Sequence, residues 1–236
     1  MEIFKLSHIT VIKDQTVVLG PVDWQIHEGR ISVILGPSGS GKTSLLRLLN
    51  RLDDPTEGTI LYNGEPIASY DVQQLRREVS MVFQRAELFP GTVRSNILWG
   101  TTIHRICVDP ADIAEMVGLP TAMLDKDVSR LSGGEAQKVS IGRAIAVGPK
   151  VLLLDEPTSG LDPTSTLQIE ELVRHLVKRL HLTCVFVTHD MEQARRVGDD
   201  AILLIDGKKV EEGSVDRLLN NPRDGRTLKF IRGQLR

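Results

Sequence analysis

Hydrophobic residues along this chain alternate between short continuous runs and helical periods. The runs Ile31–Leu35, Val151–Leu154 and Thr183–Thr188 are short and mostly apolar, a pattern typical of strands buried on both faces of a sheet. Two further sets of apolar residues recur at spacings of three and four, and these predict helices with one buried face. They are Leu45, Leu48, Leu49 and Leu52, and Ile169, Leu172, Val173, Leu176 and Leu180.

Turn residues and weaker periodicity indicate the remaining elements. Asn63-Gly64 and Asp206-Gly207 each predict a hairpin, because a type I′ turn needs positive φ at both of its central residues. Residues 3–26 alternate in short segments, as an antiparallel β-subdomain does, and residues 92–147 are helix-like. We therefore predict an α/β fold with a mostly parallel core sheet, an N-terminal antiparallel β-subdomain and an inserted helical subdomain.

The composition is that of one soluble globular domain. The 236 residues carry a formal net charge of −2, which provides no basic surface for nucleic acid. No apolar run approaches the roughly 20 residues of a membrane span, and Cys107 and Cys184 lack metal-ligand spacing. We expect a cytoplasmic protein that binds no nucleic acid and forms a single domain over residues 1–236. Its core and β-subdomain are predicted in residues 1–84 and 148–236, and its helical subdomain in residues 85–147.

A glycine-rich segment follows the first predicted core strand and precedes the first predicted helix. It reads Gly36-Pro37-Ser38-Gly39-Ser40-Gly41-Lys42-Thr43, and Ser44 comes next. The spacing matches the phosphate-binding P-loop, whose glycines turn backbone N–H groups toward an anion while the following helix points its positive end at the same anion. We expect residues 36–44 to bind a nucleotide, with Lys42 on its β- and γ-phosphates and the Thr43 hydroxyl on Mg²⁺.

Two carboxylates end the predicted strand Val151–Leu154. Asp155 is placed to hold Mg²⁺ through water, which is the second half of a P-loop site. Glu156, beside that metal, is where a base that polarises the attacking water is expected. Carboxylates also end strands merely because they face solvent, but the P-loop upstream favours the functional interpretation.

The segment Leu131-Ser132-Gly133-Gly134-Glu135 precedes another long helical stretch. Ser132 is a favourable N-cap, and the glycines leave backbone N–H groups exposed, so the segment is a candidate second anion site. Because the P-loop already holds the nucleotide of its own chain, we expect this segment to bind the nucleotide of another copy. Two copies arranged head to tail then enclose two ATP molecules in a dimer with twofold symmetry.

These motifs together resemble those of the ATPase subunits of ABC transporters, over nearly the whole chain. The resemblance implies a P-loop NTPase fold that binds ATP and Mg²⁺. It also implies a dimer of two identical copies, bound beneath integral membrane permease subunits on the cytoplasmic face of the membrane. Gln84 corresponds to the family's Q-loop glutamine, Asp162 lies in its D-loop, and His189 corresponds to the switch histidine that contacts the γ-phosphate.

The resemblance assigns further roles within the site. It implies that Glu156 and His189 are catalytic, and that Thr43, Gln84 and Asp155 hold the metal. The other nucleotide contacts that it implies, besides residues 36–44, are Ser132, Gly133, Gly134, Glu135 and Asp162.

Two positions depart from the family pattern. The family places an aromatic residue near the end of the first strand to stack on adenine, whereas this chain has Val11-Ile12-Lys13, which predicts a weaker apolar contact with the base. The family signature more often has glutamine where this chain has Glu135, although glutamate also occurs there.

Weaker resemblances bear on the kind of transporter. Residues 88–93 resemble exporters and small metal-exporter ATPases, whereas residues 161–166 and the tail from Asn221 resemble phosphate importers. We expect a phosphate-importer-like subunit, with a solute-binding protein as a further partner if the transporter is an importer. A metal-ion exporter subunit is the alternative. A soluble non-transport ABC ATPase is less favoured, because the chain has neither a second ATPase unit nor a long coiled-coil insertion.

Overall fold

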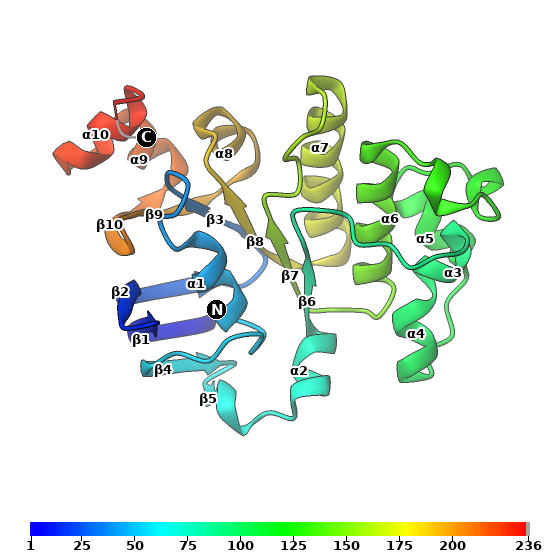
Figure 1. Cartoon of the computed structure of the whole chain (residues 1–236), viewed down its shortest axis with the longest axis horizontal. Coiled ribbons are helices and arrows are strands. Elements are labelled where there is room, and N and C mark those ends of the chain that lie inside the picture. The colour runs from blue at the N-terminus through cyan, green and yellow to red at the C-terminus, as the bar shows by residue number, and fades with distance from the viewer. Residues whose placement is uncertain (235–236) are drawn as a thin grey trace.

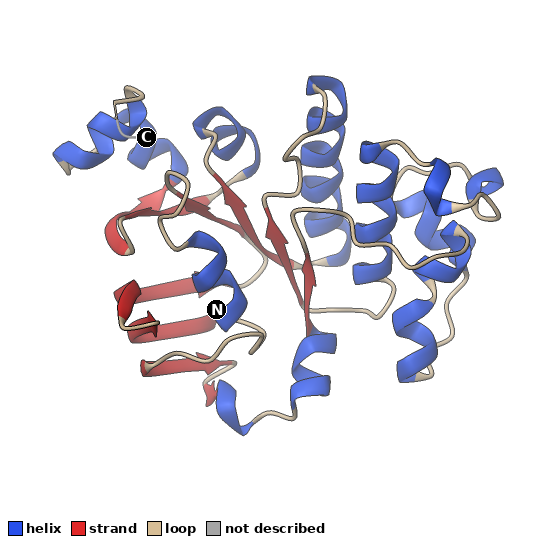
Figure 2. Ribbon diagram, in the orientation of Figure 1, coloured by secondary structure: helices blue, strands red, loops and turns tan. Residues whose placement is uncertain are grey.

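The computed structural model describes residues 1–234 and contains two sheets with helices packed around them (Figures 1 and 2). The core sheet has six strands in the order β10-β9-β3-β8-β7-β6. Its strands are β3 (Ile31–Leu35), β6 (Val79–Val82), β7 (Val151–Asp155), β8 (Thr183–Thr188), β9 (Asp200–Ile205) and β10 (Lys208–Ser214). All neighbouring pairs are parallel except the antiparallel pair of β9 and β10. The predicted mostly parallel core sheet is therefore confirmed.

The second sheet is antiparallel and has the order β2-β1-β4-β5. Its strands are β1 (Glu2–Lys13), β2 (Thr16–His27), β4 (Glu57–Tyr62) and β5 (Glu65–Pro66). Asn63 and Gly64 join β4 to β5, and both have positive φ, as the predicted hairpin requires. Asp206 and Gly207, between β9 and β10, also both have positive φ.

Ten α-helices accompany these strands within residues 1–234. They are α1 (Lys42–Leu48), α2 (Val72–Glu78), α3 (Val93–Ile97), α4 (Trp99–His104), α5 (Pro110–Met116), α6 (Gly133–Ile145), α7 (Pro163–Leu180), α8 (Met191–Val197), α9 (Val215–Asn220) and α10 (Gly225–Ile231). Helices α3 to α6 lie together beyond the β6 edge of the core sheet, on the right of Figure 1. No helix in this part of the chain combines the length and hydrophobicity needed to span a bilayer.

The core sheet is covered on both faces, which explains its continuous apolar runs. On β7, Leu152 and Leu154 pack with residues of α6 and α7 in one hydrophobic cluster. Val151 and Leu153 point the opposite way and pack with α1 and the antiparallel sheet in a second cluster. All four side chains are fully buried. Each side of the sheet thus has its own core, following the two-residue period of a strand.

The first predicted helix is shorter than its apolar spacing suggested. Helix α1 ends at Leu48, so the prediction that Leu52 shares its buried face is wrong. Arg51 has a left-handed backbone with φ 55°, and the Leu52 amide turns back to donate to the Arg47 carbonyl at 3.0 Å. A left-handed residue stops an α-helix, because the chain leaves the helical path there. The predicted boundaries of the helical subdomain, at residues 84 and 148, stay a prediction. The predicted domain also includes residues 235–236, which lie outside the described part of the chain.

Candidate nucleotide site

Three parallel strands end side by side and deliver the predicted site residues to one edge of the core sheet. Leu35 at the end of β3 is level with Thr188 at the end of β8, and Asp155 at the end of β7 is level with Val187. The P-loop, the turn containing Glu156 and the loop containing His189 leave the sheet directly after these residues. Parallel pairing therefore brings the P-loop together with two segments that lie more than a hundred residues later in the sequence.

The P-loop runs from Gly36 into α1 and depends on glycine at both ends. Gly41 is the N-cap of α1 and has φ 91°, a left-handed conformation that favours glycine. At Gly36 a Cβ atom would overlap the backbone carbonyl oxygen of Leu204. The Ser40 hydroxyl is buried and has no hydrogen-bond partner among residues 1–234. A buried polar group without a protein partner is consistent with a ligand that supplies one.

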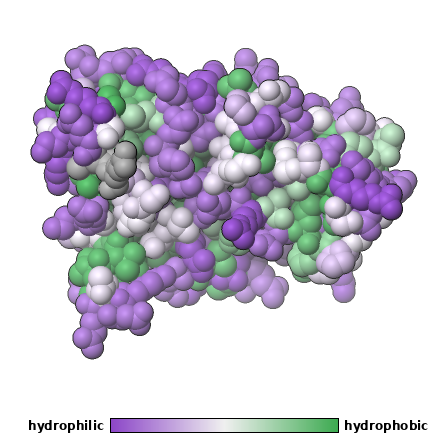
Figure 3. Space-filling view, turned by 45° about the horizontal axis from the view of Figure 1, so that its top comes forward, coloured by the Kyte–Doolittle hydropathy of each residue, from purple (hydrophilic) through white to green (hydrophobic). Residues whose placement is uncertain are grey.

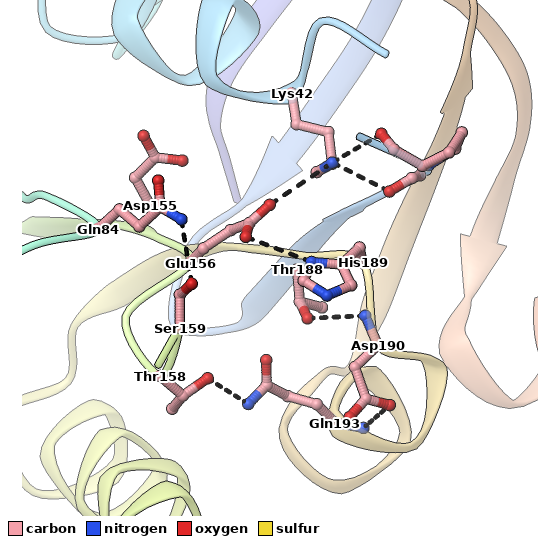
Figure 4. Close-up of polar contacts among 12 residues, drawn as sticks. Lys42, Gln84, Asp155, Glu156, Thr158, Ser159, Thr188, His189, Asp190 and Gln193 are labelled. Carbon is pink, nitrogen blue, oxygen red and sulfur yellow. Dashed lines mark hydrogen bonds and ion pairs between the residues drawn. The ribbon is translucent and has the colours of Figure 1, made fainter. Parts of the chain in front are cut away.

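Lys42 begins α1, and its side chain folds back over the loop. Its Nζ donates to the carbonyl oxygens of Gly36 at 3.0 Å and Pro37 at 2.8 Å and lies 3.6 Å from Glu156 Oε1. Burial lowers the pKa of the Lys42 ammonium, against the opposing effect of the nearby carboxylates. The ammonium is thus held at the mouth of the loop, where bound phosphates are expected (Figure 4).

Asp155 and Thr43 meet across the sheet edge. The Thr43 hydroxyl donates to Asp155 Oδ1 at 2.9 Å. Burial raises the pKa of the Asp155 carboxyl, and the bond from Thr43 opposes that effect. A hydroxyl oxygen and a carboxylate oxygen this close together form the donor set that Mg²⁺ prefers. No cluster of three or more acidic, histidine or cysteine side chains occurs in the described residues, so phosphate and water oxygens are needed to complete such a site.

Glu156 lies between the lysine and the histidine. Its Oε2 is 3.2 Å from His189 Nδ1, while its Oε1 faces Lys42 (Figure 4). Its backbone has φ 42°, in the left-handed region that residues other than glycine seldom adopt. The side chain is 18% exposed and His189 is 58% exposed. The carboxylate can therefore accept a proton from a water molecule that enters from the open side.

Gln84 and Asp162 approach the same turn from other directions. Gln84 follows β6, and its Nε2 donates to Ser159 Oγ at 3.1 Å. Asp162 is the N-cap of α7 and accepts from the backbone amides of Thr164 and Ser165, each at 3.0 Å. Hydrogen bonds from Ser165 lower the pKa of Asp162. In this structure the Asp162 carboxylate thus caps its own helix.

The predicted second anion site lies apart from the P-loop of the same chain. Ser132 caps α6 and forms a capping box with Glu135, as predicted for its N-cap role. The hydrogen bond from the Ser132 backbone amide lowers the pKa of Glu135. Glutamate can therefore accept this bond in the capping box, as glutamine would. A Cβ on Gly133 would lie 3.1 Å from Leu161, so the segment packs against the start of α7. In Figure 1, α6 and α1 lie on opposite sides of β7.

Sequence reasoning did not single out one further group of polar residues beside Glu156. Gln193 of α8 donates to the Thr158 hydroxyl at 2.8 Å, and it also donates to Glu170 at 2.9 Å. Both Gln193 and Glu170 are 3% exposed. Neither residue belongs to a motif with a known spacing, and a buried glutamine or glutamate is recognisable only once the fold is known.

A cavity of about 930 Å³ lies along α7 and α8, and none of the predicted site residues lines it. Cavity size alone would therefore not identify the P-loop as the binding site. The predicted motifs converge at the sheet edge instead, and a nucleotide held between two copies, as expected from the sequence, needs only a half-site on each copy.

Comparison with known proteins agrees with these motifs. Residues 19–159 match the family model described as ABC transporter. The chain belongs to the ABC transporter family. The chain is 41% identical to the phosphate import ATP-binding protein PstB 2 of Natronomonas pharaonis, over 94% of this chain and 84% of that protein. This assigns it as an ATP-binding, ATP-hydrolysing subunit of an ABC transporter, as the resemblance implied.

Two solved structures show the same fold. The first is cbiO1 of Clostridium perfringens, part of the ABC transporter complex cbiONQ, with a TM-score of 0.86 and 26% identity over 93% of this chain and 91% of that chain. The second is the ATP-binding cassette MJ0796, dimeric and bound to ADP and Pi in a post-hydrolysis state. It has a TM-score of 0.80 and 30% identity over 90% of this chain and 98% of that chain. The predicted P-loop NTPase fold is confirmed.

Proposed function

We propose that this chain binds Mg²⁺ with ATP and uses hydrolysis to drive a phosphate importer. The meeting of Lys42, Asp155, Glu156 and His189 at one sheet edge carries the hydrolytic part of the proposal. The choice of phosphate rests on the likeness to the phosphate import protein, which extends over 94% of the chain. It agrees with the resemblance of residues 161–166 to phosphate importers.

Each residue of the site has one task in this mechanism. Lys42 and the backbone amides of the P-loop neutralise and orient the β- and γ-phosphates. Thr43, Asp155 and Gln84 hold Mg²⁺, which withdraws charge from the phosphate oxygens when bound. The short distance between the Thr43 and Asp155 oxygens fits this role.

Glu156 is the proposed base. Its carboxylate orients a water molecule and accepts the proton as the water oxygen bonds to the γ-phosphorus, while ADP leaves with the electrons of the broken P–O bond. His189 steadies Glu156 through the 3.2 Å contact and is placed to reach the γ-phosphate. Because the two side chains come from neighbouring strands, their separation is set by the loops that follow β7 and β8.

A second copy of the chain completes the site. Ser132, Gly133 and Gly134, together with Glu135, begin α6 on the side of the molecule away from the P-loop, so they serve the nucleotide of the partner copy. A twofold dimer makes the two contacts equivalent. Asp162 lies next to this segment, because Gly133 packs against Leu161, and it accompanies the segment to the dimer interface.

The adenine base is held by aliphatic rather than aromatic contacts. The hairpin between β1 and β2 exposes Ile12 and Val17, which are 40% and 56% accessible. The hairpin lies beside the P-loop, because a Cβ on Gly41 would be 3.0 Å from the Val18 carbonyl. Figure 3 shows apolar surface over this part of the molecule, at its left. Contact without ring stacking binds the base weakly.

A membrane permease binds the helical side of the chain, on the cytoplasmic face of the membrane. Large apolar side chains are exposed on both sides of Gln84 and along α4, and Figure 3 shows apolar surface over the helical layer. They are Phe83, Phe89, Trp99 and Ile103. Phe89 and Trp99 stack with ring centroids 4.1 Å apart. In an importer, a solute-binding protein delivers phosphate to the permease from the other side of the membrane. Within this chain, residues 85–147 move as one subdomain.

Phosphate uptake in the source cells tests the transport assignment. Deletion of the gene is expected to reduce the uptake of radiolabelled phosphate at low external concentration, and the wild-type chain restores it. The Glu156→Gln chain, expressed at the same level, does not restore it. Unchanged phosphate uptake together with accumulation of a metal ion in the deletion strain would contradict the phosphate proposal and favour the metal exporter. Capture of Glu156→Gln protein from solubilised membranes with ATP then identifies the permease.

A further inference from the structure

The turn that contains Glu156 is held by side chains on two sides. Gln84 bonds to Ser159 on one side, and Gln193 bonds to Thr158 on the other (Figure 4). The turn also closes on itself, because the Ser159 amide donates to the Glu156 carbonyl at 3.0 Å. Any displacement of Thr158 or Ser159 therefore moves the Glu156 backbone, which already has a sterically restricted left-handed conformation.

Gln193 is tied equally firmly to the loop that contains His189. That loop continues into α8, where Asp190 is the N-cap and accepts from the Gln193 backbone amide at 3.2 Å. The Asp190 amide in turn donates to the Thr188 hydroxyl at 3.0 Å, at the end of β8. Gln193 thus joins the two loops: its backbone belongs to the His189 side, and its side chain reaches the Glu156 side.

Glu170 fixes the direction of the Gln193 amide. The Glu170 carboxylate, on α7, accepts from Gln193 Nε2 at 2.9 Å and from Arg196 at 2.6 and 2.8 Å. An ionised carboxylate only accepts hydrogen bonds, so the amide must turn its nitrogen toward Glu170 and Thr158. The paired Arg196 offsets the cost of burying the Glu170 charge. The amide is therefore held in one orientation by a neutralised, buried partner.

We propose that Gln193, oriented by Glu170 and Arg196, is a positioning residue for ATP hydrolysis that sets the separation of Glu156 and His189. The inference rests on the catalytic roles proposed above for those two residues. Their contact is 3.2 Å long and bridges loops from different strands. Misplacing a catalytic group by about 1 Å can slow a reaction by about a hundredfold. Within residues 1–234 the P-loop has no hydrogen bond to Gln193, Thr158, Glu170 or Arg196, and Lys42 keeps its bonds to the Gly36 and Pro37 carbonyls. We therefore expect loss of the Gln193 bonds to leave nucleotide binding largely unchanged.

The alternative is that the network only fastens α8 to α7. Loss of the Gln193 bonds would then lower the stability of the fold and leave the turnover of the folded molecules unchanged. The two interpretations differ in turnover measured at saturating ATP, in the KM for ATP, and in whether Thr158 and Gln193 act through the same bond.

The test uses the full chain with Thr158→Val, Gln193→Leu and the double variant, all of which keep the side-chain volume close to the original. Phosphate release is measured over a range of MgATP and protein concentrations, with thermal unfolding in parallel. We expect kcat to fall roughly tenfold in each single variant, within the range for a misplaced group, and KM to stay within twofold. The double variant is no slower than Gln193→Leu, because Gln193→Leu already removes the bond to Thr158 that Thr158→Val removes. Thr158→Ser, which keeps the hydroxyl, retains the wild-type kcat.

Tyr62→Phe is the matched control. It removes one partly buried hydrogen bond of similar length, from Tyr62 to Glu78 at 3.0 Å, in the antiparallel sheet away from the turn. We expect it to lower the melting temperature without changing kcat.

The outcomes separate this proposal from the proposed function. Wild-type kcat in both Thr158→Val and Gln193→Leu overturns the positioning role and leaves the ATPase assignment intact. If Gln193→Leu does not fold, the kcat of Thr158→Val is compared with that of Thr158→Ser. Equal kcat values in these two variants overturn the positioning role, and a lower kcat in Thr158→Val supports it. Wild-type turnover in Glu156→Gln overturns the base assignment and this proposal with it.

Discussion

Replacing Glu156 by glutamine isolates the contribution of its charge. The two side chains have nearly the same shape, so the turn after β7 and its left-handed φ of 42° are kept. Lys42 loses an ion pair at 3.6 Å but retains the carbonyl oxygens of Gly36 and Pro37. The phosphate site loses one negative charge, so ATP is expected to bind at least as tightly as in the wild type.

Turnover, in contrast, depends on the basicity that glutamine lacks. A positioned general base contributes about 10²- to 10⁴-fold to a rate, which corresponds to about 3 to 5 kcal/mol of activation free energy at 1.36 kcal/mol per tenfold. We expect phosphate release at saturating MgATP to fall by that factor. ATP that is bound and not hydrolysed holds the two copies together, so size-exclusion chromatography with ATP should show a lasting dimer.

Glu192→Gln is the control for this experiment. Glu192 is also an acidic residue near His189, but its side chain is 69% exposed and lies 3.8 Å from Arg195, a weak surface pair. We expect its turnover to match the wild type. The reasoning about Glu156 fails if Glu156→Gln hydrolyses ATP at the wild-type rate, or if it loses ATP binding as well as turnover.

Three further predictions concern Lys42 and Asp155 in the nucleotide site and Glu211 near the C-terminal helices. Lys42→Ala removes the buried ammonium, and ATP binding measured by calorimetry should weaken by about 2 kcal/mol or more, as for loss of a charged hydrogen bond; unchanged affinity would contradict its phosphate role. Because burial raises the pKa of Asp155 and the metal needs its ionised form, kcat/KM should decline on acidification at a higher pH than an exposed aspartate gives; a profile flat down to pH 4 would contradict this. Glu211 accepts from Arg217 at 2.7 Å and Thr227 at 2.8 Å, and its bonds outweigh burial and lower its pKa below 4.5. Its folded-state pKa lies below the unfolded one, so its stabilisation is present above about pH 4.5 and lost as pH falls through the lowered value. Loss of these charge-assisted bonds in Glu211→Gln should lower the free energy of unfolding by about 2 kcal/mol at pH 7 and by less below pH 4. An equal loss at both pH values in urea unfolding would contradict it.

Much of the architecture could be predicted because the local signals agree with the tertiary structure. The apolar runs became β3, β7 and β8, and the hairpin residues Asn63-Gly64 adopt the positive φ that their sequence favours. Ser132 caps α6 because a serine followed three residues later by glutamate satisfies two backbone amides locally. Such features depend on neighbours in sequence and need no knowledge of the rest of the fold.

Other features depend on contacts that the sequence does not reveal. Leu52 has the spacing of a helical face, but Arg51 turns the chain out of the helix before it. Strand β6 is short and joins the sheet only through its pairing with β7. Glu170 is a charged residue on the buried side of α7, where Arg196 and Gln193 of α8 both donate hydrogen bonds to it and Arg196 offsets its charge. Periodicity identifies the apolar face of a helix but cannot identify a partner on another helix.

The packing of the Ser132 segment would connect the proposed dimer with the proposed chemistry. Gly133 and Gly134 pack so closely on the start of α7 that a Cβ on Gly134 would lie 2.9 Å from Ser165 Oγ. Ser165 donates to Asp162 at 2.5 Å, and the chain leads from Asp162 back through five residues to Glu156. In the proposed dimer, a partner nucleotide on the Ser132 segment is therefore expected to act on the contact that directly follows the Glu156 turn. Because Gln193 joins the far side of that turn to the His189 loop, we expect a shift transmitted through Asp162 to move Glu156 and His189 together and to keep their separation.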